Sequence, residues 1–315
     1  MANYYIGVDV GGTTVKMGLF SEEEELLEKW EIPTRTEDAG VNILPDIVKS
    51  IEAKKEAHGG EIKGIGMGVP GPVTDDGVVL KCANLGWGVF SAKNELSSLT
   101  GVENVSIAND ANIAALGEMW KGGGRGFDSI VMVTLGTGVG GGIIVRGKIL
   151  TGAMGAGGEI GHLKVRSEGE EDLCNCGGRG CLEQYASATG IVRMAAKKIH
   201  PGAAKLEDSC LADLQEITAK AIFDGAKEKD EYCTEVVEEF GRVLGLGLAN
   251  VAQVVDPEAF VIGGGVSKAG DIIIEVIKRY YSDHVMFALQ NKEFRLAELG
   301  NDAGIYGAAR LVLEK

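Results

Sequence analysis

Four side chains that bind zinc lie within one short segment of the chain: His162, Cys174, Cys176 and Cys181. One imidazole and three thiolates form a complete ligand set for a tetrahedral structural zinc ion. The glycines between the last two cysteines tolerate positive φ angles, so the backbone can fold the thiolates around one ion. The alternative is a loop of free thiols beside an unrelated histidine. Because the chain has only six cysteines and four histidines, their concentration here favours zinc.

Two carboxylates flank this cluster and suggest a second kind of chemistry. Glu159 precedes His162 by three residues, and Glu183 follows Cys181 by two. Neither is needed as a zinc ligand, because the set of one histidine and three cysteines is complete. Both are candidates to accept hydrogen bonds from a polyhydroxylated ligand. Solvated surface glutamates would give the same spacing.

A glycine-rich turn near the N-terminus has the residue types of a phosphate-binding site. Residues 4–20 are predicted to form a strand, a turn at 11–14 and a second strand. Small residues in such a turn expose backbone N–H groups that can cradle phosphate oxygens. Asp9, at the end of the first strand, could hold Mg²⁺ through water. A plain β-hairpin explains the pattern equally well, and the turn lacks the G-x4-G-K-[ST] pattern of a Walker A loop.

The same pattern occurs again in the middle of the chain. Residues 130–149 are predicted to form a strand, a glycine-rich turn at 136–138 and a second strand. Two such hairpins in two halves indicate a duplicated fold with a ligand-binding cleft between the copies. A third glycine turn, at 263–265, follows a buried strand predicted over 259–262.

Asp110 is the candidate general base. It follows Asn109 at the end of a strand predicted over 105–108, and a helix is predicted over 111–120. In α/β sheets, side chains at this end of a strand point into the crevice where ligands bind. An aspartate that caps the helix N-terminus has the same position. Spacing alone leaves both roles open.

Hydrophobic periodicity predicts an α/β protein around these turns. Further strands are predicted over 22–30, 62–69 and 294–297, and further helices over 42–57, 186–199, 211–226, 232–254, 271–281 and 303–313. Gly245 and Gly247 indicate close packing between helices, and His58 is interpreted as a C-terminal helix cap. The glycine-rich residues 121–126 are interpreted as a flexible joint.

The composition indicates in which compartment the protein works and which classes of partner are unfavourable. Hydrophobic residues make up 45% and charged residues 24% of the 315 residues, as in soluble proteins. A net charge of −15 argues against nucleic acids and anionic membranes as partners. The sequence shows neither a membrane-spanning apolar run nor a signal peptide, which predicts a cytoplasmic protein. The remaining cysteines, Cys82, Cys210 and Cys233, are interpreted as scattered free thiols of a reducing compartment.

Six motifs together resemble the ROK family of sugar kinases, in particular its bacterial glucokinases: DVGGTTVK, NDANIAALGE, LGTGVGGG, GGEIGH, CNCGGRGCLEQYAS and VIGGGVS. They follow the family's order along the whole chain, and the cysteine loop preceded by E-x-x-H is specific to it. The resemblance implies an α/β, duplicated actin/hexokinase-like (ribonuclease H-like) fold of two lobes with an interlobe cleft. It implies a small lobe over 1–120, on which a C-terminal helix at 300–315 packs, and a large lobe over 121–299 with the zinc loop.

The resemblance also implies roles for the candidate residues. Asp110 would be the general base that takes the proton from the 6-hydroxyl of the sugar as it attacks the γ-phosphate of ATP. His162 would bind zinc through one ring nitrogen and face the sugar with the other. The implied sugar-binding residues are Gly71, Asn84, Asn109, Asp110, Glu159, His162 and Glu183. The implied residues for ATP and Mg²⁺ are Asp9, Gly11, Gly12, Thr13, Thr14, Gly136, Thr137, Gly138, Gly263, Gly264 and Gly265.

The implied activity is ATP-dependent phosphorylation of glucose, with one structural zinc per chain, Mg²⁺ bound with ATP, and assembly as a dimer or a dimer of dimers. A kinase for another hexose, such as mannose or an N-acetylhexosamine, fits the same motifs, because pocket shape reads the 2-substituent. The family also includes sugar-sensing repressors. These carry an N-terminal helix-turn-helix module, whereas the kinase pattern here begins at Tyr4.

Overall fold

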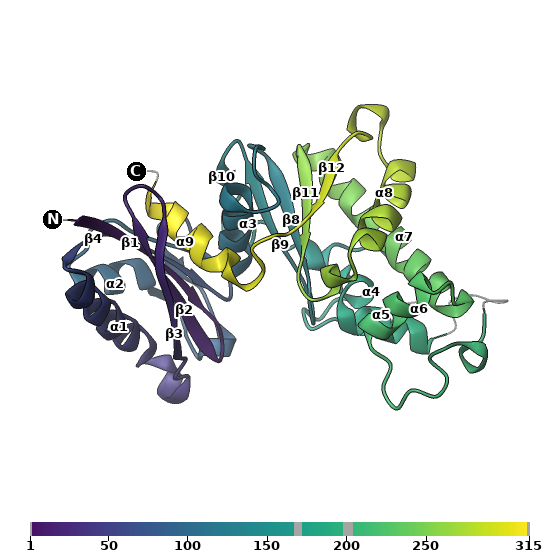
Figure 1. Ribbon diagram of the computed structural model, residues 1–315, viewed down its shortest axis with the longest axis horizontal. Helices are drawn as coiled ribbons and strands as arrows, with labels where there is room; N and C mark the ends of the chain where they lie inside the picture. The colour runs from purple at the N-terminus through teal and green to yellow at the C-terminus, as the bar shows by residue number, and fades with distance from the viewer. Residues whose placement is uncertain (1, 167–171, 198–203, 314–315) are drawn as a thin grey trace. The chain divides into compact units, whose positions relative to one another are not determined.

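The computed structural model describes residues 2–166, 172–197 and 204–313 (Figure 1). The chain divides into two compact units. Unit 1 comprises Met1–Asp128, Gly142–Gly158 and Leu299–Lys315, and unit 2 comprises Ser129–Gly141 and Glu159–Glu298. Among the helices of the described residues, none is long and apolar enough to cross a membrane.

Unit 1 contains a five-stranded sheet in the order β3-β2-β1-β4-β7. Its strands are β1 (Ala2–Val10), β2 (Thr14–Ser21), β3 (Leu26–Pro33), β4 (Gly60–Val69) and β7 (Val105–Asn109). β1 pairs antiparallel with β2, placing Val8 opposite Met17, and parallel with β4. The predicted hairpin over 4–20 is therefore confirmed. The edge strand predicted over 22–30 begins only at Leu26, because residues 22–25 form the turn that follows β2.

Four helices belong to unit 1: α1 (Ile43–His58), α2 (Ala92–Thr100), α3 (Asp110–Lys121) and α9 (Ala303–Leu313). A small antiparallel pair, β5 (Val78–Val79) and β6 (Phe90–Ser91), lies between β4 and α2 in the chain. α9 packs directly on β1 and β4 (Figure 1). A Cβ atom at Gly7 would lie 2.0 Å from the carbonyl oxygen of Ile305, and one at Gly66 would lie 1.7 Å from that of Ala308. Only glycine permits this approach, and α9 thereby completes the core of unit 1.

The C-terminal cap of α1 is Gly59, and the interpretation of His58 as the cap is wrong. Gly59 has a φ of 68°, and its N–H donates to the carbonyl of Lys55. Glycine adopts this left-handed conformation without a Cβ penalty. His58 is instead the last helical residue, and its Nε2 lies 2.9 Å from Oε2 of Glu28 on β3.

The predicted flexible joint at 121–126 is a packed turn. The buried carboxylate of Glu118 accepts hydrogen bonds from the N–H of Gly123 and of Leu299, both at 2.8 Å. These bonds hold the segment to α3. Sequence also placed a domain boundary between 120 and 121, whereas unit 1 continues to Asp128 and includes Gly142–Gly158. A Cβ at Gly142 would lie 2.5 Å from that of Ala115, which shows how closely this segment packs on α3.

The second five-stranded sheet has the order β10-β9-β8-β11-β12. Its strands are β8 (Ile130–Leu135), β9 (Val139–Val145), β10 (Lys148–Ile149), β11 (Ala259–Gly263) and β12 (Glu293–Leu296). β11 pairs parallel with β8 and with β12. The boundary between the units falls within β9, after Gly141.

The helices of unit 2 are α4 (Glu183–Ala186), α5 (Ala188–Ala196), α6 (Ala219–Lys227), α7 (Glu231–Val255) and α8 (Asp271–His284). The helix predicted over 186–199 is interrupted at Ser187, whose Oγ caps α5 by accepting from Gly190 N, and residues 198 and 199 lie outside the described ranges. The helix predicted over 211–226 is wrong in its first half. Residues 211–218 form turns, and Thr218 caps α6.

The long helix α7 packs closely on α8, as predicted from its glycines. A Cβ at Gly245 would lie 2.8 Å from the backbone nitrogen of Tyr281, and one at Gly241 would lie 2.2 Å from Cγ2 of Val276. Gly247 faces Leu182 instead. The helix ends at Asp256, which adopts a left-handed conformation before Pro257.

Candidate metal centre and catalytic residues

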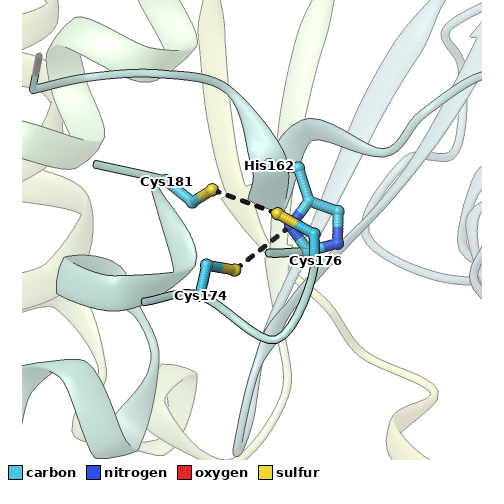
Figure 2. Close-up of side chains that lie close together, drawn as sticks. All are labelled: His162, Cys174, Cys176 and Cys181. Carbon is cyan, nitrogen blue, oxygen red and sulfur yellow. Dashed lines mark hydrogen bonds between the residues drawn. The ribbon is translucent and has the colours of Figure 1, made fainter. Parts of the chain in front are cut away.

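The four predicted zinc ligands converge in unit 2 (Figure 2). His162 ends a short 3₁₀ turn, Cys174 and Cys176 lie on a tight turn, and Cys181 comes just before α4. The turn is closed by two hydrogen bonds of 2.8 Å, from Cys174 N to Gly178 O and from Gly177 N to Cys174 O. Figure 2 shows the three sulfur atoms and the imidazole directed toward one point.

The distances between these atoms fit a zinc tetrahedron. With Zn–S bonds of about 2.3 Å and a Zn–N bond of about 2.05 Å, tetrahedral edges are about 3.8 Å between sulfurs and about 3.6 Å between sulfur and nitrogen. Sγ of Cys176 lies 3.6 Å from Sγ of Cys181, and Sγ of Cys174 lies 3.6 Å from Nδ1 of His162. All four ligand atoms lie within 4.8 Å of one another. The donor set and its spacing therefore both suit zinc.

Lys164 adds a positive charge to this cluster, and sequence reasoning missed it. Its Nζ donates a hydrogen bond of 2.7 Å to Sγ of Cys181. A Cβ at Gly178 would lie 2.4 Å from this Nζ, so the glycine makes room for the ammonium group. A zinc ion with three thiolates carries one net negative charge, which Lys164 balances. A single lysine near the cysteines has no spacing signal that could have marked it.

The metal-free thiols differ in acidity. Burial raises the pKa of Cys174 to about 11, whereas the backbone N–H of Gly178 lowers the pKa of the exposed Cys176. A zinc ligand must be a thiolate, so metal binding releases a proton from Cys174 at neutral pH. Hydrogen bonding to Cys181 raises the pKa of Lys164, which keeps its ammonium charged.

The two flanking carboxylates both contact the cluster. Nε2 of His162 lies 3.9 Å from Oε2 of Glu159, on the side of the ring away from the metal-facing Nδ1. Glu183, the first residue of α4, accepts a hydrogen bond from Val139 N at 3.1 Å, and the Cys174 thiol donates to it at 3.8 Å. The structure thus brings Glu159, His162 and Glu183 together around the cluster.

The turn at Gly136–Gly138 is tied to the helices that follow the cysteine loop. The carbonyl of Gly136 accepts from Ala188 N at 2.8 Å, and that of Thr137 accepts from Thr189 Oγ1 at 2.9 Å. A Cβ at Gly138 would lie 2.2 Å from Oε2 of Glu183, so this glycine makes room for the carboxylate.

A pocket of about 520 Å³ lies next to this turn in unit 2. Gly136, Thr137 and Gly265 line it, together with Ala219 and Phe223 of α6. Gly264 has a φ of 85°, and a Cβ there would lie 2.5 Å from the carbonyl oxygen of Leu135. Gly264 therefore allows the backbone to turn after β11. A Cβ at Gly263 would lie 3.1 Å from side-chain carbons of Met132 and Ala297, so this glycine serves close packing.

In unit 1, Asn109 rather than Asp110 caps α3. Oδ1 of Asn109 accepts from Ala111 N at 2.9 Å and from Asn112 N at 3.2 Å, while its Nδ2 donates to Gly71 O at 3.1 Å. Asp110 is the exposed first residue of the helix. The alternative in which Asp110 is the N-cap is therefore wrong. Asn109 instead ties the predicted sugar-binding residue Gly71 to the catalytic candidate.

Asp9 lies at the end of β1, close enough to Asp110 for the two carboxylates to interact. The pKa of Asp9 is raised to about 6, first by desolvation and then by the charge of Asp110, against an opposing effect from Lys16. A Cβ at Gly304 would lie 2.4 Å from Oδ2 of Asp9, which places the first turn of α9 against this carboxylate. The structure therefore brings Asp9 and Asp110 together at the carboxyl ends of β1 and β7.

The remaining predicted residues of unit 1 lie on two turns. In the first, Gly11 N donates to Thr14 O at 3.0 Å, Thr34 N donates to Thr13 O at 2.9 Å, and Gly12 is exposed. Asn84 is exposed on a 3₁₀ turn at Ala83–Leu85.

Comparison with known proteins gives a consistent result. The sequence matches the ROK family over residues 5–315. It is 44% identical to a glucokinase from Halalkalibacterium halodurans, with 99% of this chain and 96% of the relative covered. A glucokinase from Thermotoga maritima is 37% identical, with 98% and 97% covered. Among solved structures, a ROK family glucokinase from Streptomyces griseus in complex with glucose and AMPPNP matches with a TM-score of 0.72 at 33% identity, covering 99% of this chain and 100% of that one.

Proposed function

The chain belongs to the ROK family, and we propose that it is a glucokinase, which transfers the γ-phosphoryl group of ATP to the 6-hydroxyl of glucose. The observation that carries this function is the similarity to glucokinases along the whole chain, at 44% identity for the Halalkalibacterium protein. The Streptomyces griseus relative binds glucose and AMPPNP. The fold is the α/β actin/hexokinase-like fold of these kinases, as predicted from sequence.

In this proposal Asp110 is the general base. A carboxylate oxygen of Asp110 accepts the proton of the 6-hydroxyl while the sugar oxygen attacks the γ-phosphorus. Asn109 is the N-cap of α3 and accepts from the N–H groups of Ala111 and Asn112, while Asp110 Oδ1 shares only that of Ala111, at 2.8 Å. A positioned base contributes about 10²–10⁴-fold in rate. Positioning and charge neutralisation supply most of the rest in phosphoryl transfer.

Asp9 is the proposed residue for Mg²⁺. Asp9 is half-buried, and desolvation together with the nearby Asp110 raises its pKa, so its charge is poorly compensated in the free protein. A cation nearby would relieve this. Mg²⁺ bound with ATP neutralises charge on the phosphates. The backbone of Gly11–Thr14 is proposed to bind the phosphates.

The residues around the metal centre are proposed to hold the sugar. Glu159 and Glu183 accept hydrogen bonds from its hydroxyls, and Nε2 of His162 faces it while Nδ1 faces the metal. Zinc, when bound, fixes the cysteine loop and the plane of the His162 ring. The 3.9 Å separation of His162 Nε2 and Glu159 Oε2 supports this division of the ring, because a hydroxyl group can bridge the two atoms.

The pocket beside Gly136–Gly138 is proposed to hold the nucleoside part of ATP. Its lining combines glycine backbone at Gly136 and Gly265 with the aromatic ring of Phe223. Such a mixture of apolar walls and a few polar backbone groups is typical of small-molecule sites. The lysine and aspartate of α6 that also line it, Lys220 and Asp224, are exposed or partly exposed.

A phosphorylation assay with several sugars tests the function. Glucose, mannose, fructose and N-acetylglucosamine are each incubated with Mg-ATP, and sugar phosphate is measured for the native protein and for Asp110→Asn. We expect preferential turnover of glucose and a loss of about 10²–10⁴-fold in the variant. Preferential turnover of another sugar would correct the substrate. Sugar binding without any turnover would contradict the kinase assignment.

We also propose one zinc per chain, a cytoplasmic location, assembly as a dimer or a dimer of dimers, and no nucleic acid or membrane partner. Metal analysis tests the zinc, cell fractionation the location, light scattering the assembly, and a DNA-binding titration at low salt the absence of a nucleic acid partner. The proposed sugar site depends on the zinc, because His162 is both a proposed zinc ligand and a proposed sugar-binding residue.

A further inference from the structure

Two cysteines outside the zinc cluster form a pair in unit 2. Sequence placed Cys210 and Cys233 among scattered thiols, and this is wrong: their Sγ atoms lie 3.9 Å apart. Cys210 is exposed on the turn before α6, and Cys233 is buried in the first turn of α7. Folding brings them together because α6 and α7 pack against each other and the chain reverses between them.

Gly225 on α6 makes room for both sulfur atoms. A Cβ there would lie 2.5 Å from Sγ of Cys233 and 2.8 Å from Sγ of Cys210. Any side chain at this position would push the thiols away. The two sulfurs therefore occupy one small space above a helix that has no side chain at that point.

Asp230 holds the backbones of both cysteines. Its carboxylate accepts from Cys210 N at 2.8 Å, from Cys233 N at 2.9 Å and from Ser209 Oγ at 2.9 Å. With its oxygens engaged in these three bonds, Asp230 is poorly available as a metal ligand. Two thiols without further ligands do not make a zinc site, which requires three or four protein donors.

We propose that Cys210 and Cys233 are an oxidisable dithiol that forms a reversible disulfide under hydrogen peroxide. The thiolate of Cys210 attacks one peroxide oxygen, the O–O bond breaks, and hydroxide leaves with a sulfenic acid on Cys210. The sulfur of Cys233 then attacks the Cys210 sulfur, the S–O bond breaks, and the oxygen leaves as water with the Cys233 proton. Two thiols are oxidised by two electrons, and one peroxide is reduced to water.

The surroundings of the two thiols assign this order of events. Cys210 is the exposed thiol that peroxide can reach. Burial raises the pKa of Cys233 to about 12, which suppresses its direct reaction with peroxide. The Sγ–Sγ distance of 3.9 Å must close to the bonded length of about 2.05 Å, and Gly225 beneath the two sulfurs has no side chain that would oppose this movement. The closed loop contains α6, which lines the pocket through Ala219 and Phe223.

Peptide mapping tests the proposal. Zinc-loaded, fully reduced protein is treated with increasing hydrogen peroxide, alkylated under denaturing conditions and digested with trypsin. Cleavage separates the cysteines into residues 206–220, which contain Cys210, residues 230–242, which contain Cys233, and separate peptides for the zinc ligands and Cys82. We expect a cross-link between 206–220 and 230–242, a fall from six free thiols to four per chain, and recovery on adding dithiothreitol.

Cys210→Ser is the matched control, because this exposed position tolerates a hydroxyl. The variant should keep its five thiols at the same peroxide dose and show no cross-link. Cys233→Ala should also show no cross-link, but its Cys210 should be trapped as a sulfenic acid by dimedone, because the thiol that would resolve it is missing. Buried Cys82 is the internal reference that stays reduced. Oxidation and zinc release from the cluster before any 206–220 to 230–242 link would overturn the proposal. A second zinc per chain that is lost in Cys210→Ser would also overturn it, in favour of a metal site.

Discussion

Nε2 of His162 lies 3.9 Å from Oε2 of Glu159, while Nδ1 of the same ring lies 3.6 Å from Sγ of Cys174. The two nitrogens of one imidazole thus face two different partners. A metal on Nδ1 leaves the proton on Nε2, where it can be donated to an oxygen. The orientation of the His162 ring therefore depends on the cysteine loop, and it determines where Nε2 lies relative to Glu159.

Glu159→Gln should weaken glucose binding without releasing zinc. The change removes the charge that faces Nε2 and keeps the shape, so the cluster itself is untouched. Hydrogen bonds to charged groups contribute about 1.5–3 kcal/mol, which corresponds to an increase in the glucose KM of about 10- to 100-fold. Steady-state kinetics and metal analysis check the two effects. Glu95→Gln, an exposed change on α2, is the control. An unchanged glucose KM would argue against a sugar contact at Glu159.

Cys176→Ser should lose zinc and weaken sugar affinity more than ATP affinity. Serine is a poor zinc ligand, and the loop that carries His162 depends on the ion for its order. We expect well below one zinc per chain, an increase of about tenfold or more in the glucose KM and little change for ATP. Atomic absorption and titrations with each substrate measure this. Normal sugar binding by a zinc-free variant would refute the role given to the cluster.

Lys164→Met should reduce zinc retention, because it removes the cation that balances the three thiolates. Changes to groups around metal ligands typically cost 10–100-fold in metal affinity, and Lys164 is exposed, so we expect about tenfold. Competition with a chelating dye measures the affinity. Lys164→Arg should restore part of it. Lys63→Met, which removes a lysine paired with Glu61 on the surface, should have no effect on zinc.

Asp9→Asn should abolish activity and yet stabilise the metal-free protein at neutral pH. The folded-state pKa of Asp9 is raised from 3.8 to about 6, so the ionised form is disfavoured by folding. This costs stability above pH 6, at most about 3 kcal/mol at pH 7, and the cost fades as the pH falls through 6 toward 3.8. Urea unfolding of native protein and variant should therefore differ at pH 7 and converge near pH 4. Asp75→Asn, at an exposed position, is the control and should leave the free energy of unfolding unchanged. If Asp9→Asn lowered the free energy of unfolding at pH 7, the raised pKa of Asp9 would be contradicted.

Local patterns predicted the features that depend on neighbouring residues in the chain. The zinc ligands lie close together in the sequence, so their spacing identified them, and the glycines of α7 correctly indicated close helix packing at Gly245. The hairpin over 4–20 was predicted for the same reason. Its alternation and its turn are both local signals.

Features that depend on the folded geometry rather than on local sequence patterns were not predicted. Asn109 and Asp110 are adjacent acceptors, and only the backbone geometry of α3 decides that the first of them makes the cap. Cys210 and Cys233 become neighbours through the packing of α6 on α7. The packed turn after α3 was also not predicted. It depends on the buried carboxylate of Glu118, which accepts hydrogen bonds from the N–H groups of Gly123 and Leu299, two residues far apart in the sequence.

The position of α9 has a consequence for how the protein is made. Unit 1 begins with β1, but the helix that covers β1 and β4 begins only at Ala303. At 5–20 residues per second, a ribosome needs about 10 to 40 seconds to advance from Asp128 to Leu313. During that interval α9 is not yet available to cover the face of β1 and β4 on which it packs, while the residues of unit 2 are being translated. The core of unit 1 is therefore expected to be completed only after α9 has been synthesised.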